Sequence, residues 1–166
     1  MAHTAESSDV PRLFCDIKKM PMEDQESWLK VCDEEMKSLT DRKVWKLVDL
    51  PPGRKPVKCR WVFVAKSNGH KKVRLVAKGF TQVYGIDFKE TFLPVAWFET
   101  VCILLALATL EDWDIQVLNV KTTYLYGELD EEIYMEQPEG YVKKGQGEKV
   151  CCLLKSLYGL KQSALQ

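Results

Sequence analysis

The feature that most constrains the fold is a pair of strand-like runs on either side of an Asn-Gly dipeptide. Residues 58–66 and 71–78 alternate apolar and basic side chains, and Asn68-Gly69 lies between them. An Asn-Gly pair flanked by alternating apolar residues is the strongest short-range signal for a β-hairpin, because both residues tolerate the backbone of a tight turn. The stretch therefore predicts two antiparallel strands.

The register of this hairpin follows from burial. An odd-length loop pairs odd positions with odd positions, so that one face is apolar and carries Trp61, Phe63, Ala65, Val73, Leu75 and Ala77. The other face then carries the cations Lys58, Arg60, Lys66, Lys72, Arg74 and Lys78. An even loop would set the aromatic side chains opposite basic ones, since a one-residue slip moves every side chain to the other face. We therefore predict the odd register.

A one-sided cationic hairpin has two interpretations. Guanidinium and ammonium groups match phosphate oxygens, so the face suits a phosphate-binding finger. Lysine on an exposed hairpin also discourages edge-to-edge aggregation, so the face is equally compatible with a solvated surface. The pattern alone leaves both open.

The N-terminal quarter of the chain contains a leader and a helix. Residues 1–20 are aperiodic, which predicts a flexible leader before a single domain over 21–166. Acidic residues after Pro21 and apolar residues at helical spacing from Trp28 to Leu39 predict an amphipathic helix. A short strand at 44–48 is expected to end at the turn Pro51-Pro52-Gly53.

The C-terminal half predicts a second helix and more strands. Residues 99–110 are apolar nearly all round, which indicates a buried helix packed beneath a strand at 115–120. We expect further strands within 131–141 and at 150–154, and a helix beginning at 156–163.

The composition excludes several classes of protein. With 46% hydrophobic residues and 24 charges of each sign, the chain is neither disordered nor drawn as a whole to nucleic acid. Six cysteines form no C-x-x-C pair, and His3 and His70 have no suitably spaced partners, so no zinc site is expected. The longest apolar run is about half a membrane span, and no signal peptide is recognisable. These features predict a reduced intracellular protein, cytoplasmic or nuclear, without membrane contact.

Several segments resemble the copia-type (Ty1/copia, Pseudoviridae-like) retrotransposon reverse transcriptases. Residues 74–82 have the sequence Arg-Leu-Val-Ala-Lys-Gly-Phe-Thr-Gln, and 84–95 contain Gly-Ile-Asp-Phe and Glu-Thr-Phe-x-Pro-Val, as in that family. Further matching segments lie at 113–129, 131–141 and 156–163. The resemblance implies an α+β fold, namely the fingers and the first half of the palm, with a basic β-hairpin and a helix-backed antiparallel sheet. The second catalytic hairpin and the thumb are expected to be absent. Without that hairpin, the strand at 115–120 would have an unpaired edge, which predicts self-association.

The resemblance also implies roles for individual residues. Arg74 and Lys66 would contact the triphosphate of a deoxynucleotide, and Tyr124 would lie under its sugar. From the residues alone, Tyr124 is equally well a half-buried core aromatic. Candidate contacts to nucleic acid are Lys72, Lys78, Lys155, Lys161 and Gln162.

Asn119 occupies the position of the family's first metal-binding aspartate. Two-metal polymerisation requires clustered carboxylates, and an asparagine keeps the shape of the ligand without its charge. Asp114 lies roughly 16 Å along an extended strand from Asn119 and cannot replace it. The intact family binds two Mg²⁺, whereas no metal or other cofactor is expected here. Without the resemblance, Asn119 is interpreted as a residue that caps a turn at the end of a strand.

Three hypotheses follow. The chain is a fragment of a copia-type reverse transcriptase that no longer polymerises because Asn119 replaces the aspartate and the Tyr-x-Asp-Asp element is absent. Alternatively, it is a domesticated module that binds nucleic acid or protein, with weak affinity for RNA or an RNA/DNA hybrid. The third hypothesis is a split enzyme whose missing carboxylates come from a second chain.

Overall fold

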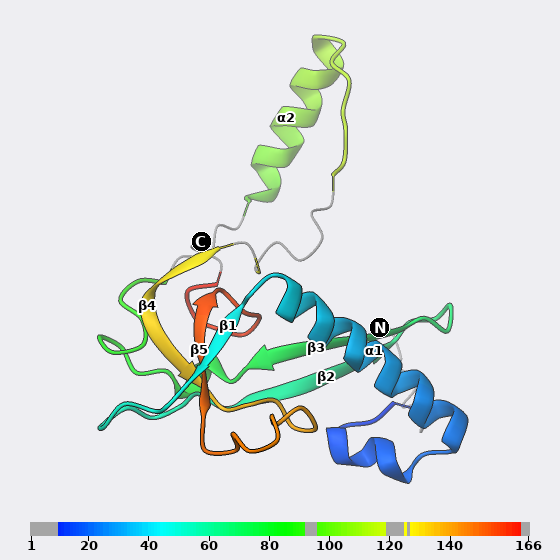
Figure 1. Ribbon diagram of the computed structural model, residues 1–166. Coiled ribbons are helices and arrows are strands. Elements are labelled where there is room, and N and C mark those ends of the chain that lie inside the picture. Colours follow the sequence, from blue (N-terminus) through cyan, green and yellow to red (C-terminus); the bar gives the residue numbers. More distant parts are fainter. Residues whose placement is uncertain (1–9, 92–95, 119–124, 126, 164–166) are drawn as a thin grey trace.

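The computed structural model describes residues 10–91, 96–118, 125 and 127–163 (Figure 1). The chain forms two antiparallel sheets and several helices, an α+β arrangement as predicted. The three-stranded sheet has the order β1-β5-β4, and β2 and β3 form a separate hairpin. The elements are η1 (Phe14–Lys19), α1 (Met22–Asp41), β1 (Trp45–Val48), β2 (Cys59–Ala65), β3 (Lys71–Ala77), η2 (Gly79–Thr81), α2 (Phe98–Leu110), β4 (Glu128–Met135) and β5 (Val150–Lys155).

The β2–β3 hairpin has the predicted odd register. Trp61 pairs with Leu75, Phe63 pairs with Val73, and Cys59 pairs with Ala77. The inward side chains Trp61, Phe63, Val73 and Leu75 are at most 9% exposed. Burial of one face therefore selects the register, as the alternation of side chains requires.

Helix α1 closes the apolar face of the hairpin. Its buried residues Trp28, Cys32 and Leu39 follow the helical period, and the Trp28 ring meets the Phe63 ring edge-on at 5.6 Å between centroids. Lys71 adds an ion pair across the contact, with its Nζ 2.7 Å from Asp24 Oδ1. Each fully buried side chain of this size contributes about 1.5–3 kcal/mol, so the helix and hairpin stabilise one another.

The three-stranded sheet shares its core with the hairpin. Central strand β5 pairs with β1 through Trp45↔Leu153 and with β4 through Ile133↔Leu153. Ile133, Met135 and Cys151 are completely buried and belong to the same apolar cluster as Trp28. The strands predicted at 44–48, within 131–141 and at 150–154 are therefore confirmed.

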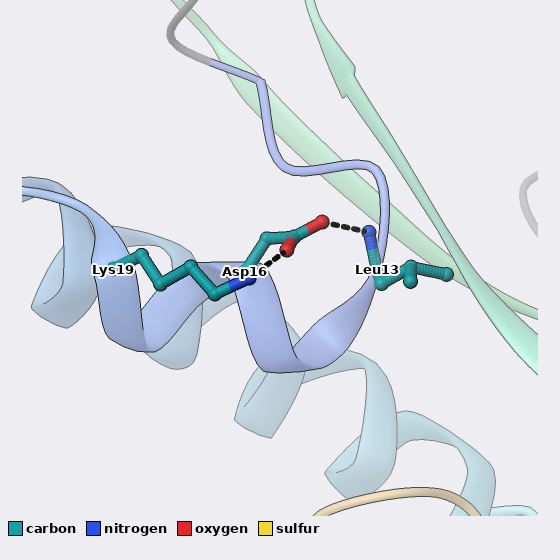
Figure 2. Close-up of polar contacts among 3 residues, drawn as sticks. All are labelled: Leu13, Asp16 and Lys19. Atoms are coloured by element: carbon teal, nitrogen blue, oxygen red, sulfur yellow. Dashed lines mark hydrogen bonds and ion pairs between the residues drawn. The ribbon is translucent and has the colours of Figure 1, made fainter.

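Residues 10–20 pack against the rest of the fold. Phe14 and Ile17 of η1 are buried, and the Phe14 ring stacks on Trp61 at 6.0 Å between centroids. Figure 2 shows Asp16 accepting the Leu13 backbone N–H at 3.0 Å and the Lys19 ammonium at 3.1 Å. Two apolar side chains of residues 10–20 thus complete the core, and the flexibility expected for residues 1–20 stays a prediction.

Helix α2 forms where predicted but is not buried. Figure 1 shows α2 projecting away from both sheets, and Ala108 is its one buried residue. The expected strand beyond it, in its described part 115–118, is extended and exposed without strand pairing, with Val117 94% exposed. The predicted packing of this helix beneath a sheet is therefore wrong. Self-association through the edge of that strand stays a prediction.

The segment 156–163 is a pair of turns and not the start of a helix. The Leu160 N–H donates to the Leu157 carbonyl, and the Ser163 N–H donates to the Leu160 carbonyl, both at 3.3 Å. Gly159 between them has φ +89°, which is incompatible with a right-handed helix.

Within the residues that the structure describes, no helix is long and apolar enough to cross a membrane.

Candidate nucleic-acid interface

The outward face of the hairpin presents cations separated by valines. Arg60, Lys72 and Arg74 are exposed, and their cross-strand partners are Val76, Val64 and Val62. Because no two of these cations lie directly opposite one another, the face carries its charge without the closest like-charge contacts. Lys66 is exposed in the loop, and its backbone N–H donates to the His70 carbonyl at 3.0 Å.

An aromatic ring lies against the central cation of this face. The guanidinium carbon of Arg74 is 4.7 Å from the centroid of the half-buried Tyr158 ring. This distance is within the range of a cation–π interaction. The segment 156–163 thus meets the hairpin at the residue for which the resemblance implies a phosphate contact.

Two glycines allow this approach of backbone to backbone. A Cβ atom on Gly159 would lie 2.2 Å from the Ala77 carbonyl oxygen, and one on Gly79 would lie 2.1 Å from the Gly159 carbonyl oxygen. The Ala77 N–H donates to the Tyr158 carbonyl at 2.7 Å, which covers the outer edge of β3. Only residues without a side chain fit at this crossing.

A buried pair of glutamines joins the same two segments. Gln82 Nε2 donates to Gln162 Oε1 at 3.0 Å, and Gln82 Oε1 accepts the Lys161 backbone N–H at 2.9 Å. Gln162 Nε2 also donates to the Asp87 carbonyl at 2.9 Å. Gln162 is only 1% exposed, so it has no surface for nucleic acid and its predicted contact is wrong. Its amide serves the fold, because buried polar groups require partners.

The remaining lysines with predicted contacts lie in different surroundings. Lys161 is exposed, with its Nζ 3.3 Å from the Gln82 carbonyl oxygen and 4.5 Å from the centroid of the Phe88 ring. Lys78 is half-buried, and its N–H donates to the Lys58 carbonyl at 2.7 Å. Lys155 is half-buried at the end of β5, opposite Glu128. The structure therefore gathers Lys66, Lys72 and Arg74 on one hairpin and leaves Lys155 in the other sheet.

A half-buried carboxyl group on α1 lies near the hairpin. Burial raises the pKa of Glu35 on α1, and a hydrogen bond with the Leu75 backbone and the nearby Arg74 charge partly offset the rise. Glu35 is therefore a carboxyl group near the Arg74 charge that comes from α1. No local sequence pattern marks Tyr158, Gln82 or Glu35 as part of this interface, because their contacts join residues far apart in the sequence.

Asn119 occupies the position at which the family resemblance implies a polymerase metal ligand. Asn119 and Tyr124 lie outside the described residues. Among the residues that the structure does describe, no three His, Cys, Asp or Glu side chains group as a metal site. Asp112 and Asp114 are exposed beside α2. The sequence has a neutral amide at position 119, and an amide lacks the charge that an aspartate ligand would supply.

Comparison with known proteins identifies the relatives of this chain. A family profile described as reverse transcriptase (RNA-dependent DNA polymerase) matches residues 42–166. The Pol polyprotein of transposon TNT 1-94 from Nicotiana tabacum is 49% identical over 143 residues, which is 83% of this chain and 11% of the relative. The corresponding polyprotein of RE1 from Arabidopsis thaliana is 39% identical over 144 residues, which is 83% of this chain and 10% of the relative.

A more distant relative widens this group. The Gag-Pol polyprotein of Ty1-ER2 from Saccharomyces cerevisiae is 29% identical over 153 residues, which is 86% of this chain and 8% of the relative. No solved structure matches. The chain spans about a tenth of the length of each of these polyproteins. By its motifs, its profile match and these relatives, the chain belongs to the copia-type retrotransposon reverse transcriptase family.

Proposed function

We propose that this chain is a reverse-transcriptase segment that does not polymerise DNA. The observation that carries the proposal is Asn119, because polymerisation requires an anionic ligand to hold two metal ions against their mutual repulsion. The Tyr-x-Asp-Asp sequence also does not occur in these 166 residues. The fingers and partial palm are the part of the family that the chain would represent.

Primer extension tests this proposal. The purified chain is incubated with a primed RNA template, labelled deoxynucleotides and Mg²⁺ or Mn²⁺. We expect no incorporation, and none after Asn119→Asp alone, because one carboxylate does not hold both ions. Incorporation by the unmodified chain would overturn the proposal. Incorporation by Asn119→Asp alone would show that the amide at 119 is the single defect.

A second candidate function is phosphate-directed binding of nucleic acid by the outward face of the hairpin. It is favoured by the exposed Arg60, Lys72 and Arg74 and by the aromatic ring beside Arg74. Cations on one face bind a phosphate backbone with little regard to base sequence. Weak binding of RNA or an RNA/DNA hybrid is the expected activity, and the neutral overall charge confines it to this face.

Fluorescence anisotropy with labelled RNA and hybrid duplex at several salt concentrations tests the second candidate. Replacing Lys72 and Arg74 together by alanine removes two phosphate contacts, so the slope of log affinity against log salt should fall by about 1.4 to 1.8. Lys30→Ala with Lys37→Ala, two exposed positions on α1, is the matched control for lost charge. Equal losses in both double variants would indicate general electrostatic attraction without an interface.

A further inference from the structure

Arg74 differs from the other outward cations of the hairpin in its surroundings. An exposed arginine on a strand samples many rotamers, and ordering its side chain on a ligand costs conformational entropy. Here the guanidinium lies 4.7 Å from the centroid of the Tyr158 ring. A planar cation stacked on a ring keeps its N–H donors in the plane of the guanidinium, where they remain accessible to a phosphate.

Backbone contacts fix the position of Tyr158 relative to β3. The Tyr158 carbonyl accepts the Ala77 N–H at 2.7 Å, so residue 158 is fixed relative to β3. Gly159 follows directly and lies against the Val76 side chain and the Ala77 carbonyl. The buried pair Gln82–Gln162 then secures the next turn. These contacts fix the backbone of residue 158 beside β3, so only rotation about the side-chain torsions of Tyr158 can move its ring away from Arg74.

We propose that Tyr158 is a positioning residue that holds the Arg74 guanidinium ready to bind phosphate. This inference rests on the proposed binding of nucleic acid by the hairpin. The ligand is a phosphate group, supplied by the backbone of a polynucleotide or by a nucleoside triphosphate. Tyr158 contributes by restricting the arginine before binding, so less conformational entropy is lost when the phosphate arrives. The aromatic ring of Tyr158, and not its hydroxyl group, has this positioning role.

Four variants test the pairing by their affinity for labelled RNA. Arg74→Ala should weaken binding, and Tyr158→Leu should weaken it by about two- to fivefold, the range of an exposed cation–π interaction. Tyr158→Phe keeps the ring and should bind as the unmodified chain does. In the Arg74→Ala background, Tyr158→Leu should cause no further loss, because the ring acts through the arginine.

The outcomes separate this inference from the proposed function. No loss in Arg74→Ala would overturn both. A loss in Arg74→Ala with none in Tyr158→Leu would overturn the positioning role alone, as would additive losses in the double variant. Competition with a deoxynucleoside triphosphate identifies the source of the phosphate. If the triphosphate displaces RNA and this displacement depends on Tyr158, the site binds a nucleotide. If RNA binding depends on Tyr158 but the triphosphate does not displace the RNA, the site binds a polynucleotide backbone.

A spectroscopic readout keeps the inference testable if Tyr158→Leu does not fold. In chain labelled with ¹⁵N-arginine, the Nε–Hε signal that disappears in Arg74→Ala belongs to Arg74. Stacking on Tyr158 should shift this signal away from those of exposed arginines, and added triphosphate should perturb it first. An Arg74 signal at the position of exposed arginines would overturn the inference.

Discussion

Helix α1 and helix α2 differ in how apolar composition relates to burial. Helix α1 belongs to the packed body, which consists of η1, α1 and the two sheets, whereas α2 projects away from both sheets. Helix α1 is the more polar of the two, yet Trp28, Cys32 and Leu39 are at most 1% exposed because they share one face. Helix α2 is almost entirely apolar, yet Leu104 is 55% exposed and Leu110 is 80% exposed. An amphipathic helix needs a partner on one side, whereas a uniformly apolar helix needs cover all round. The apolar content of a helix therefore predicts that it needs packing partners. The distribution of its apolar residues around the helix predicts how much packing surface the rest of the domain must provide.

The largest expected effect comes from truncating the same residue type in each helix. Leu39→Ala removes a side chain that is 1% exposed and should lower the free energy of unfolding by about 2–5 kcal/mol. Leu104→Ala in α2 should change it by less than about 0.5 kcal/mol. Urea denaturation followed by tryptophan fluorescence measures both. Comparable losses would show that α2 is covered in solution and would end the contrast.

A second prediction concerns how closely the body is packed at the Gly159 crossing. Gly159→Ala should destabilise the fold by more than about 2 kcal/mol, because a left-handed residue with a Cβ atom is strained and this one also meets the Ala77 carbonyl. Gly145→Ala is the matched control, since Gly145 also has positive φ but nothing lies within 4 Å of its Cβ position. Its cost should be about 1–2 kcal/mol, from strain alone. Equal melting temperatures for the two variants would mean that the crossing is loose.

The smallest effect is the dependence of stability on pH at Glu35. Because burial raises the pKa of Glu35, the folded chain holds this proton more tightly than the unfolded chain. The resulting stabilisation is complete below the ordinary pKa of 4.5 and is lost as the pH rises through the raised value. Glu35→Gln should therefore stabilise the fold modestly at neutral pH and leave it unchanged in acid. Glu34→Gln, at the exposed neighbour, is the control. The same response in both variants would point to net charge and not to burial.

Local signals in the sequence were sufficient for the hairpin and for α1. Asn68-Gly69 and the alternation around it define both strands and their register, and the apolar spacing from Trp28 to Leu39 defines the helix face. These elements depend on neighbours within a few positions, which a sequence displays directly. The burial pattern of β4 and β5 likewise follows from short apolar runs.

The remaining features depend on contacts between distant residues. No local pattern reveals that Phe14 packs on Trp61, or that Arg74 meets Tyr158. The helix expected at 156–163 was wrong because Gly159 is required by the Ala77 carbonyl across the crossing, and that constraint is invisible in the segment itself. Similarly, motif matching assigned Gln162 to the surface, although its partners Gln82 and Asp87 bury it.

The crossing at Gly159 also bears on how the chain folds as it is synthesised. The hairpin is local and forms in microseconds once both strands are available. Gln82 and Gln162, however, are 80 positions apart. At ribosomal rates of about 5–20 residues per second, Gln162 is added roughly 4–16 seconds after Gln82. During that interval the Ala77 N–H on the outer edge of β3 lacks its final partner, the Tyr158 carbonyl. A chaperone or a neighbouring nascent chain can bind at this edge in the meantime.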